Sequence, residues 1–360
     1  MSEQVVVTGL AARSAFGPDT SALLARAFTG EPAFTPVRRF DATARRSGVA
    51  ATLPGAPVLA DELVAVIEDA CRVAGDPGPR TGPLLLAAHA DRSNAATAAD
   101  VALRVGVAGG VRTYTAACVA ASTAVADAAT MIATGRHDRV VVAAGFLVDE
   151  DIFALFDAGR VLARDGAVRP FSTGRLGMVL GDAIAAVVLE SASSAAERGA
   201  RVRARLAGWG RCGDAYHVCQ PRPDGTGMAR AITSALDRAG VGPDDVGYVN
   251  ANGTGTVFND AAEAAALRLT FGDRLPRVPV SSTKSVHGHA LEATGLLELV
   301  ITVLALRAGR LPVNAGYLGP DVDCPLDVVV GRPRPSGARY ALSVNAAFGG
   351  ANTALLVGAP

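Results

Sequence analysis

The stretch from Arg112 to Gly135, RTYTAACVAASTAVADAATMIATG, decides the fold. Its first residues, Arg112 to Ala117, are predicted to form a strand, and Val119 to Ala133 a helix of almost entirely small residues. A helix without a polar face is expected to be buried on every side. Cys118 lies where the strand ends and this helix begins. A thiol at a helix N-terminus faces the positive end of the helix dipole, which lowers its pKa, so the pattern predicts a nucleophile at a sharp turn.

Strands and helices alternate on both sides of this stretch, which predicts an α/β architecture with covered sheets. The element order is similar in the two parts of the chain, so we expect two similar halves, residues 1–200 and 201–360. One amphipathic helix, about Ala60 to Ala74, lies in an Arg-, Pro- and Gly-rich segment and is predicted to be surface decoration. The expected strands are Val5–Thr8, Pro83–Ala88, Arg139–Ala144 and Ala183–Glu190, then Arg203–Trp209, Gly247–Ala251, Val278–Ser281, Tyr340–Ala346 and Thr353–Val357.

The composition argues against several classes of protein. The 360 residues include 34 basic and 34 acidic ones without a basic run, so no nucleic-acid partner is expected. The most apolar stretch, Ala116 to Thr134, contains Asp127 and is too short for a bilayer, so no membrane partner is expected. The N-terminus has no basic n-region and no long apolar segment, which predicts a cytoplasmic protein. The five cysteines form no CxxC pair, which argues against disulfides and against a metal site.

Three further motifs accompany Cys118. Asn250 to Thr256 (NANGTGT) is a strand end followed by a glycine turn that places amide donors beside hydroxyls. Ser281 to His289 (SSTKSVHGH) holds two of the five histidines and Lys284, the only lysine; an ammonium buried beside a carboxylate is one reason for a single Lys. Phe348 to Asn352 (FGGAN) is a tight glycine turn near the C-terminus. Taken singly, these patterns also occur in purely structural turns.

With these motifs in this order, the chain resembles a β-ketoacyl-[acyl carrier protein] synthase of the thiolase superfamily over nearly its whole length. The resemblance implies a thiolase-like layered α-β-α-β-α fold of two similar halves. The segments that carry it are Val5–Gly9, Thr115–Cys118, Arg169–Asp182, Asp214–His217, Pro223–Gly225, Asn252–Thr256, Asn259–Glu263, Ser282–His289 and Phe348–Asn352.

The resemblance also implies a mechanism. The cysteine accepts an acyl chain as a thioester, and malonyl on a carrier protein then loses carbon dioxide and attacks that thioester as a carbanion. No cofactor is bound, because the substrate is carried on the phosphopantetheine arm of an acyl carrier protein, and the chain forms a homodimer or a heterodimer with a ketosynthase. The resemblance implies that Cys118 is the nucleophile, that the N–H groups of Cys118 and Phe348 form the oxyanion hole, and that His289 donates a hydrogen bond to the malonyl thioester. It also implies that Lys284 pairs with Glu263. Thr254 and Thr256 would contact the phosphopantetheine arm, and Phe348 would also act as a gate.

Several positions depart from the family pattern. Asn252 stands where the family has its first catalytic histidine. Its amide can donate a hydrogen bond to a thioester oxygen, but it cannot act as a general base or carry a positive charge. Glu292 occupies a glycine position after His289. The chain is also shorter than a usual synthase, with deletions around residues 54–61 and 88–95.

Two functions are compatible with this sequence. The first is a chain-length-factor-like partner of a competent ketosynthase in a type II polyketide or fatty-acid synthase, which Asn252 and the shortened chain favour. The alternative is an active β-ketoacyl synthase or transacylase that uses Cys118 and His289 on carrier-bound acyl chains. His217 is expected to have a structural hydrogen-bonding role. Both functions require that Cys118, His289 and Asn252 meet in one buried pocket.

Overall fold

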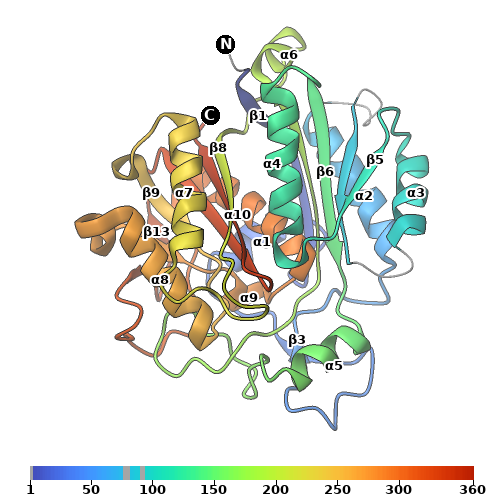
Figure 1. Ribbon diagram of the computed structural model, residues 1–360. Coiled ribbons are helices and arrows are strands. Elements are labelled where there is room, and N and C mark those ends of the chain that lie inside the picture. Colours follow the sequence, from blue (N-terminus) through green and yellow to red (C-terminus); the bar gives the residue numbers. More distant parts are fainter. Residues whose placement is uncertain (1–2, 76–81, 90–93) are drawn as a thin grey trace.

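The stretch that begins near Arg112 forms a strand, a sharp turn and a helix. The structure is a computed structural model that describes residues 3–75, 82–89 and 94–360 (Figure 1). Strand β5 (Val111–Tyr114) is followed by the 3₁₀ turn η1 (Ala117–Val119) and by α4 (Ala120–Ala133). Nine of the 14 residues of α4 are buried, as a helix of small residues predicts.

A mixed sheet of eleven strands runs through the described part of the chain, in the order β12-β10-β9-β14-β15-β8-β1-β7-β6-β4-β5. Its strands are β1 (Val5–Ser14), β4 (Leu84–Ala87), β5, β6 (Arg139–Phe146), β7 (Ala183–Ser191), β8 (Ala204–Gly213), β9 (Val246–Asn250), β10 (Pro279–Ser281), β12 (Asp327–Val328), β14 (Tyr340–Ala347) and β15 (Ala351–Gly358). Two small sheets pair β2 (Thr35–Pro36) with β3 (Val49–Ala50) and β11 (Arg310–Leu311) with β13 (Arg334–Pro335).

Ten α-helices are described, and most of them lie in three layers around this sheet. They are α1 (Thr20–Ala27), α2 (Leu59–Val73), α3 (Asn94–Val105), α4, α5 (Glu150–Ala158), α6 (Ala192–Glu197), α7 (Thr226–Ala239), α8 (Val257–Phe271), α9 (Lys284–His287) and α10 (Thr294–Ala308). In Figure 1, α2 and α3 lie at one side of the molecule, α7 and α8 at the other, and α4 and α10 between them.

Alternate residues of each strand face different helices, which produces these layers. In β6, Val140 and Val142 belong to the core around α4 and α10, whereas Val141 and Ala143 belong to the core beneath α2. In β15, Leu355 and Val357 likewise face the central core, and Ala354 and Leu356 face α7. The layered α-β-α-β-α fold predicted from the sequence is therefore confirmed.

The strand order repeats within the sheet. In the first part of the chain β1-β7-β6 are antiparallel neighbours and β6-β4-β5 are parallel; in the second part β8-β15-β14 are antiparallel and β14-β9-β10 are parallel. The two sets meet where β1 pairs with β8. The division into residues 1–200 and 201–360 stays a proposal, and it falls in the segment between α6 and β8.

The helix predicted as surface decoration is instead part of the core. α2 buries Leu63, Val66 and Ile67 in the core that it shares with β6 and β7. The strand predicted to end at Thr8 continues through Gly9, with a bulge there. A Cβ at Gly9 would come within 2.1 Å of the Ala70 carbonyl oxygen, so glycine lets α2 approach the strand, a long-range contact that local sequence does not reveal.

Of the interval 88–95, where the sequence predicts a deletion, residues 90–93 lie outside the described part of the chain. Within the described ranges, no helix has the length and apolarity needed to cross a membrane.

Candidate active site

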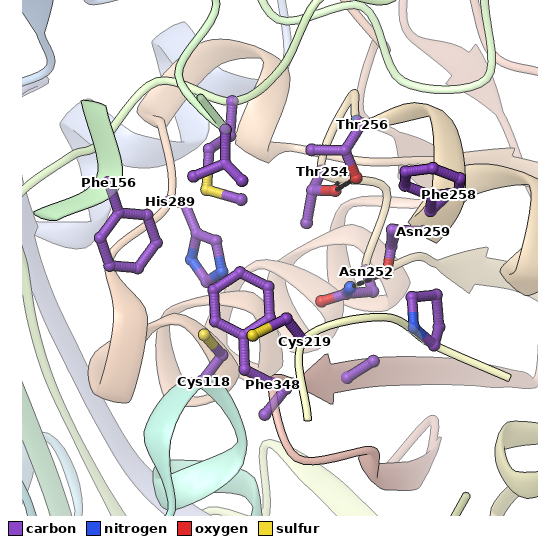
Figure 2. A pocket seen from close by; sticks show the side chains of 15 residues that line it. Cys118, Phe156, Cys219, Asn252, Thr254, Thr256, Phe258, Asn259, His289 and Phe348 are labelled. Atoms are coloured by element: carbon purple, nitrogen blue, oxygen red, sulfur yellow. Dashed lines mark hydrogen bonds between the residues drawn. The ribbon is translucent and has the colours of Figure 1, made fainter. Parts of the chain in front are cut away.

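Most of the residues predicted to be functional lie around one pocket. Cys118 follows β5, Asn252 follows β9, His289 follows β10 and α9, and Phe348 follows β14. Because β14, β9 and β10 are parallel neighbours, their carboxyl ends lie at the same edge of the sheet. Six of the predicted residues line the pocket shown in Figure 2: Cys118, Asn252, Thr254, Thr256, His289 and Phe348. Lys284 and Glu263 are buried and contact Asn252 through hydrogen bonds.

Cys118 lies in the sharp turn η1 before α4, where Ala117 has a φ of 47°. The prediction that the helix N-terminus lowers the pKa of this thiol is wrong. Burial raises the pKa of Cys118 to about 12, the carboxyls of Glu292 and Glu298 add to that increase, and only Lys284 among the nearby charged side chains opposes it. At rest the side chain is therefore a protonated thiol, and its proton must leave when the sulfur attacks.

The His289 ring lines the pocket and is held in one tautomer. Its Nδ1 accepts the backbone N–H of Leu291 at 3.2 Å and lies 2.9 Å from the Thr294 hydroxyl, which itself accepts the Ala290 N–H at 2.8 Å. Burial and the nearby Lys284 hold the pKa of His289 well below its ordinary value, so the ring is neutral. Nδ1 is then the acceptor and Nε2 carries the proton, which makes His289 a hydrogen-bond donor toward a carbonyl oxygen.

Asn252 occupies the third corner of the pocket, and its amide is held on both sides. The Asn259 side chain accepts a hydrogen bond from Asn252 Nδ2 at 2.8 Å, and Lys284 Nζ donates to Asn252 Oδ1 at 3.3 Å. The predicted meeting of Cys118, His289 and Asn252 is therefore confirmed as a placement in one pocket.

The expected ion pair between Lys284 and Glu263 is not the pair that forms. Both oxygens of Glu263 accept backbone N–H groups, from Asn252 and from Gly253, each at 2.7 Å. Lys284 Nζ instead lies 2.7 Å from Glu298 Oε1 of α10. The sequence signal that could have found this partner is Glu298 itself, the single carboxylate in the mostly apolar helix α10.

The Glu298 carboxylate links two parts of the site. Its second oxygen accepts a hydrogen bond from Asn345 Nδ2 of β14 at 2.6 Å, so the chain of contacts runs from β14 through Glu298 and Lys284 to Asn252. None of these four side chains is exposed to water. A buried network of this kind fixes the orientation of the Asn252 amide, because the amide oxygen, the ammonium and both carboxylate oxygens have a partner in place.

The entrance of the pocket carries hydroxyls and an aromatic ring. Thr254 and Thr256 lie with their hydroxyl oxygens 2.8 Å apart. Phe348 is 44% exposed and stacks on Phe156, with ring centroids 6.1 Å apart. The glycine after it, Gly349, has a φ of 86°, which a residue with a side chain rarely adopts. The contact of Thr254 and Thr256 with the phosphopantetheine arm stays a proposal, as does the role of Phe348 as a gate.

A third buried carboxyl of the site, that of Glu292, lies beside the thiol, and the sequence did not predict its partner. Glu292 is 4% exposed, its Oε1 is 2.9 Å from His89 Nδ1, and its Oε2 has no hydrogen-bond partner among the described residues. Local sequence does not reveal this pair, because 203 positions separate His89 from Glu292. Within the part of the chain described here, no group of His, Cys, Asp and Glu side chains could hold a metal ion.

Removing the Glu292 charge is expected to make Cys118 easier to alkylate. Because the Glu292 carboxyl raises the pKa of the Cys118 thiol, Glu292→Gln lowers that pKa and increases the thiolate fraction at a given pH. A shift of about one pKa unit, usual for a close like charge, gives roughly tenfold faster alkylation. Iodoacetamide labelling at several pH values with peptide mapping of Cys118 measures this rate. Glu197→Gln, at an exposed carboxyl, is the control; equal rates in wild type and Glu292→Gln would contradict the prediction.

Known families and structures match the chain. The model of the beta-ketoacyl synthase N-terminal domain matches residues 75–195, and that of the C-terminal domain matches residues 203–317. Nodulation protein E of Rhizobium leguminosarum bv. trifolii is 43% identical over 263 residues, which cover 72% of this chain and 64% of that protein. The match thus spans less than two thirds of that relative's length.

Solved structures match over the full chain. The ishigamide ketosynthase/chain length factor is 28% identical, with a TM-score of 0.93 and complete coverage of both chains. A type II PKS acyl-carrier protein in complex with its ketosynthase bound to the hexaketide contains a chain that is 25% identical, with a TM-score of 0.91 and complete coverage of both chains. The fold is the thiolase-like ketosynthase fold, and the chain belongs to the beta-ketoacyl synthase family.

Proposed function

We propose that the chain is a ketosynthase-like subunit of a type II polyketide or fatty-acid synthase that works beside a condensation-competent ketosynthase, as a chain-length-factor-like partner. The observation that carries this proposal is Asn252. The amide lies in the pocket beside His289 and Cys118, held between Lys284 and Asn259. It can neither take up a proton nor carry a positive charge, so the pocket has one imidazole where condensation in this family uses two.

Two other observations support a role without condensation. The buried Glu292 carboxyl beside Cys118 opposes formation of the thiolate that a nucleophile needs. The likeness to a ketosynthase/chain length factor structure over the whole chain is compatible with such a partner.

A second candidate, acyl transfer or condensation by the chain itself, is favoured by the retained nucleophile. Cys118 lies in the same pocket as the neutral, Nε2-protonated ring of His289. A thiol and a hydrogen-bond donor are sufficient to form an acyl thioester, even where decarboxylation is lost. In either role, the pocket takes acyl groups carried on the phosphopantetheine arm of an acyl carrier protein, with Thr254 and Thr256 contacting the arm.

Incubation of the purified chain with acyl- and malonyl-carrier protein separates the candidates. Intact mass measures acylation of Cys118, and trapped carbon dioxide measures decarboxylation. The proposal expects carbon dioxide release from the chain alone to be barely above the rate without protein, and a stable complex with changed product length when a condensation-competent ketosynthase is added. Carbon dioxide and a 3-oxoacyl product from the chain alone would establish a condensing enzyme instead. Acylation without carbon dioxide and without complex formation would establish a transacylase.

A further inference from the structure

The pocket contains a second cysteine that no role assigned so far uses. Cys219 lines the same pocket as Cys118 and comes from the loop between β8 and α7, about a hundred positions further along the chain. Figure 2 shows both thiols, with Phe348, among the side chains that line it. We propose that Cys219 is a second acyl-accepting thiol of this pocket, which takes an acyl group from a carrier-borne thioester by thiol–thioester exchange. The inference rests on one part of the proposed function, that the pocket takes carrier-borne thioesters.

The loop that carries Cys219 is fixed beside the turn at Phe348. The backbone N–H of Gly349 donates to the Val218 carbonyl at 2.8 Å, which joins the residue before Cys219 to the residue after Phe348. On the other side, His217 Nδ1 accepts the N–H groups of Cys219 and Gln220 at 3.0 and 3.1 Å. The structural role predicted for His217 is thereby confirmed, and the backbone of Cys219 is held at the pocket.

The base of the loop is tied to the same turn. Asp214 donates its N–H to the Gly350 carbonyl at 2.8 Å, and its carboxylate accepts the Arg222 N–H at 3.0 Å and the Asn352 amide at 2.7 Å. The hydrogen bonds therefore bracket Cys219 from residue 214 to residue 222. A thiol on a loop fixed in this way stays at the pocket instead of moving freely over the surface.

The two thiols of the pocket differ in how easily they react. Cys118 is 7% exposed, and burial raises its pKa to about 12, so almost no thiolate is present near neutral pH. Cys219 is exposed to solvent. An arriving thioester therefore meets an accessible thiol at Cys219, whereas reaction at Cys118 requires full insertion and loss of a strongly held proton.

The exchange step is balanced without any oxidant or further reactant. The Cys219 sulfur attacks the thioester carbonyl, a new carbon–sulfur bond forms, and the bond to the sulfur of the carrier arm breaks. The Cys219 proton passes through solvent to the released thiol of the arm. His217 is not the base through Nδ1, because that atom already accepts two backbone N–H groups. One acyl-Cys219 and one free carrier thiol result.

Cys212 provides a matched control. It is partly exposed and lies on β8, close to the same loop, but it does not line the pocket. Its thiol lies 3.5 Å from the Gly213 carbonyl. Acyl transfer that reflects only general thiol reactivity should label Cys212 as well as Cys219, whereas transfer that depends on the pocket should favour Cys219.

The test uses hexanoyl-pantetheine, a thioester on the arm without the carrier protein, with wild type, Cys118→Ala, Cys118→Ala/Cys219→Ser and Cys118→Ala/Cys212→Ser. Intact mass and peptide mapping locate the label, and release by neutral hydroxylamine shows that it is a thioester. We expect Cys118→Ala to carry one hexanoyl group at Cys219. Adding Cys219→Ser should reduce the label by about tenfold or more, and adding Cys212→Ser should change it less than about twofold. Thermal melting checks that each variant is folded.

Three results would overturn the proposal, and they bear differently on the proposed function. Label on wild-type Cys118 but none on Cys118→Ala rejects the second site and leaves thioester binding by the pocket intact. Equal labelling of Cys212 and Cys219 attributes the reaction to exposed thiols in general. No label on any folded variant, wild type included, rejects the second site together with the premise that the pocket takes carrier-type thioesters.

Discussion

Asn252→His is expected to raise carbon dioxide release from malonyl carrier protein by roughly 10²- to 10⁴-fold, the usual contribution of a positioned acid or base. The histidine Nδ1 and the asparagine Oδ1 are both two bonds from Cβ. Lys284 Nζ, which donates to the amide oxygen at 3.3 Å, can therefore donate to Nδ1 of the new ring. Nε2 then carries its proton into the pocket, as in His289. The second imidazole would thus appear in the tautomer that stabilises a developing enolate oxygen.

Carbon dioxide release and thermal melting of the purified variants measure this effect. Phe258→His is the matched control, because Phe258 lines the same pocket but is 63% exposed, so its replacement adds an imidazole without touching the Asn252 network. The control should leave the rate within about twofold of wild type, since an imidazole that is not positioned contributes little. If the folded Asn252→His variant released carbon dioxide no faster than wild type, the missing imidazole would not be the only reason why the pocket does not condense. Glu292 beside the thiol would then be the next residue to change.

The parts of the site that follow from local pattern could be predicted from the sequence. Cys118 was located by the strand-to-helix change, and Asn252, His289 and Phe348 by polar or glycine-rich segments that follow predicted strands. Parallel strands place such segments at one edge of a sheet, and the structure brings them into one pocket. The fold class and the layers could be predicted in the same way, from the alternation of strands and helices and from the small residues of α4.

The parts that depend on distant contacts could not be predicted. The pKa of Cys118 was expected to fall because the helix terminus is a local feature, but it rises because burial and carboxyls far away in the sequence dominate. The partner of Lys284 was misassigned, since position alone does not reveal that Glu263 is already occupied by two N–H groups. The contact of Gly9 with α2 is likewise set by packing between segments some 60 residues apart.

Lys284→Met is expected to lower the free energy of unfolding by about 3–5 kcal/mol, the usual cost of removing one member of a buried ion pair. Lys284 and Glu298 are 1% and 0% exposed in their side chains, and their charged atoms lie 2.7 Å apart. Without the ammonium, the Asn345 amide is the one side-chain donor to Glu298 among the described residues, and the carboxylate stays buried in α10. Urea unfolding of the purified variants measures the loss.

Two control variants and the pH dependence identify the cause of this loss. Arg211→Met removes the pair with Asp127, whose charged atoms lie 2.9 Å apart but whose side chains are 48% and 26% exposed, and should cost only about 0–1 kcal/mol. Lys284→Met/Glu298→Gln removes the unpaired charge and should recover part of the stability. Burial raises the pKa of Glu298 above its ordinary 4.5 in the folded chain. Once the lysine is gone, folding therefore takes up a proton. The stability lost in Lys284→Met should then grow as pH rises and shrink in acid. A deficit no larger than that of Arg211→Met, or one that does not change with pH, would mean that the pair does not stabilise the fold and that its value lies in orienting Asn252.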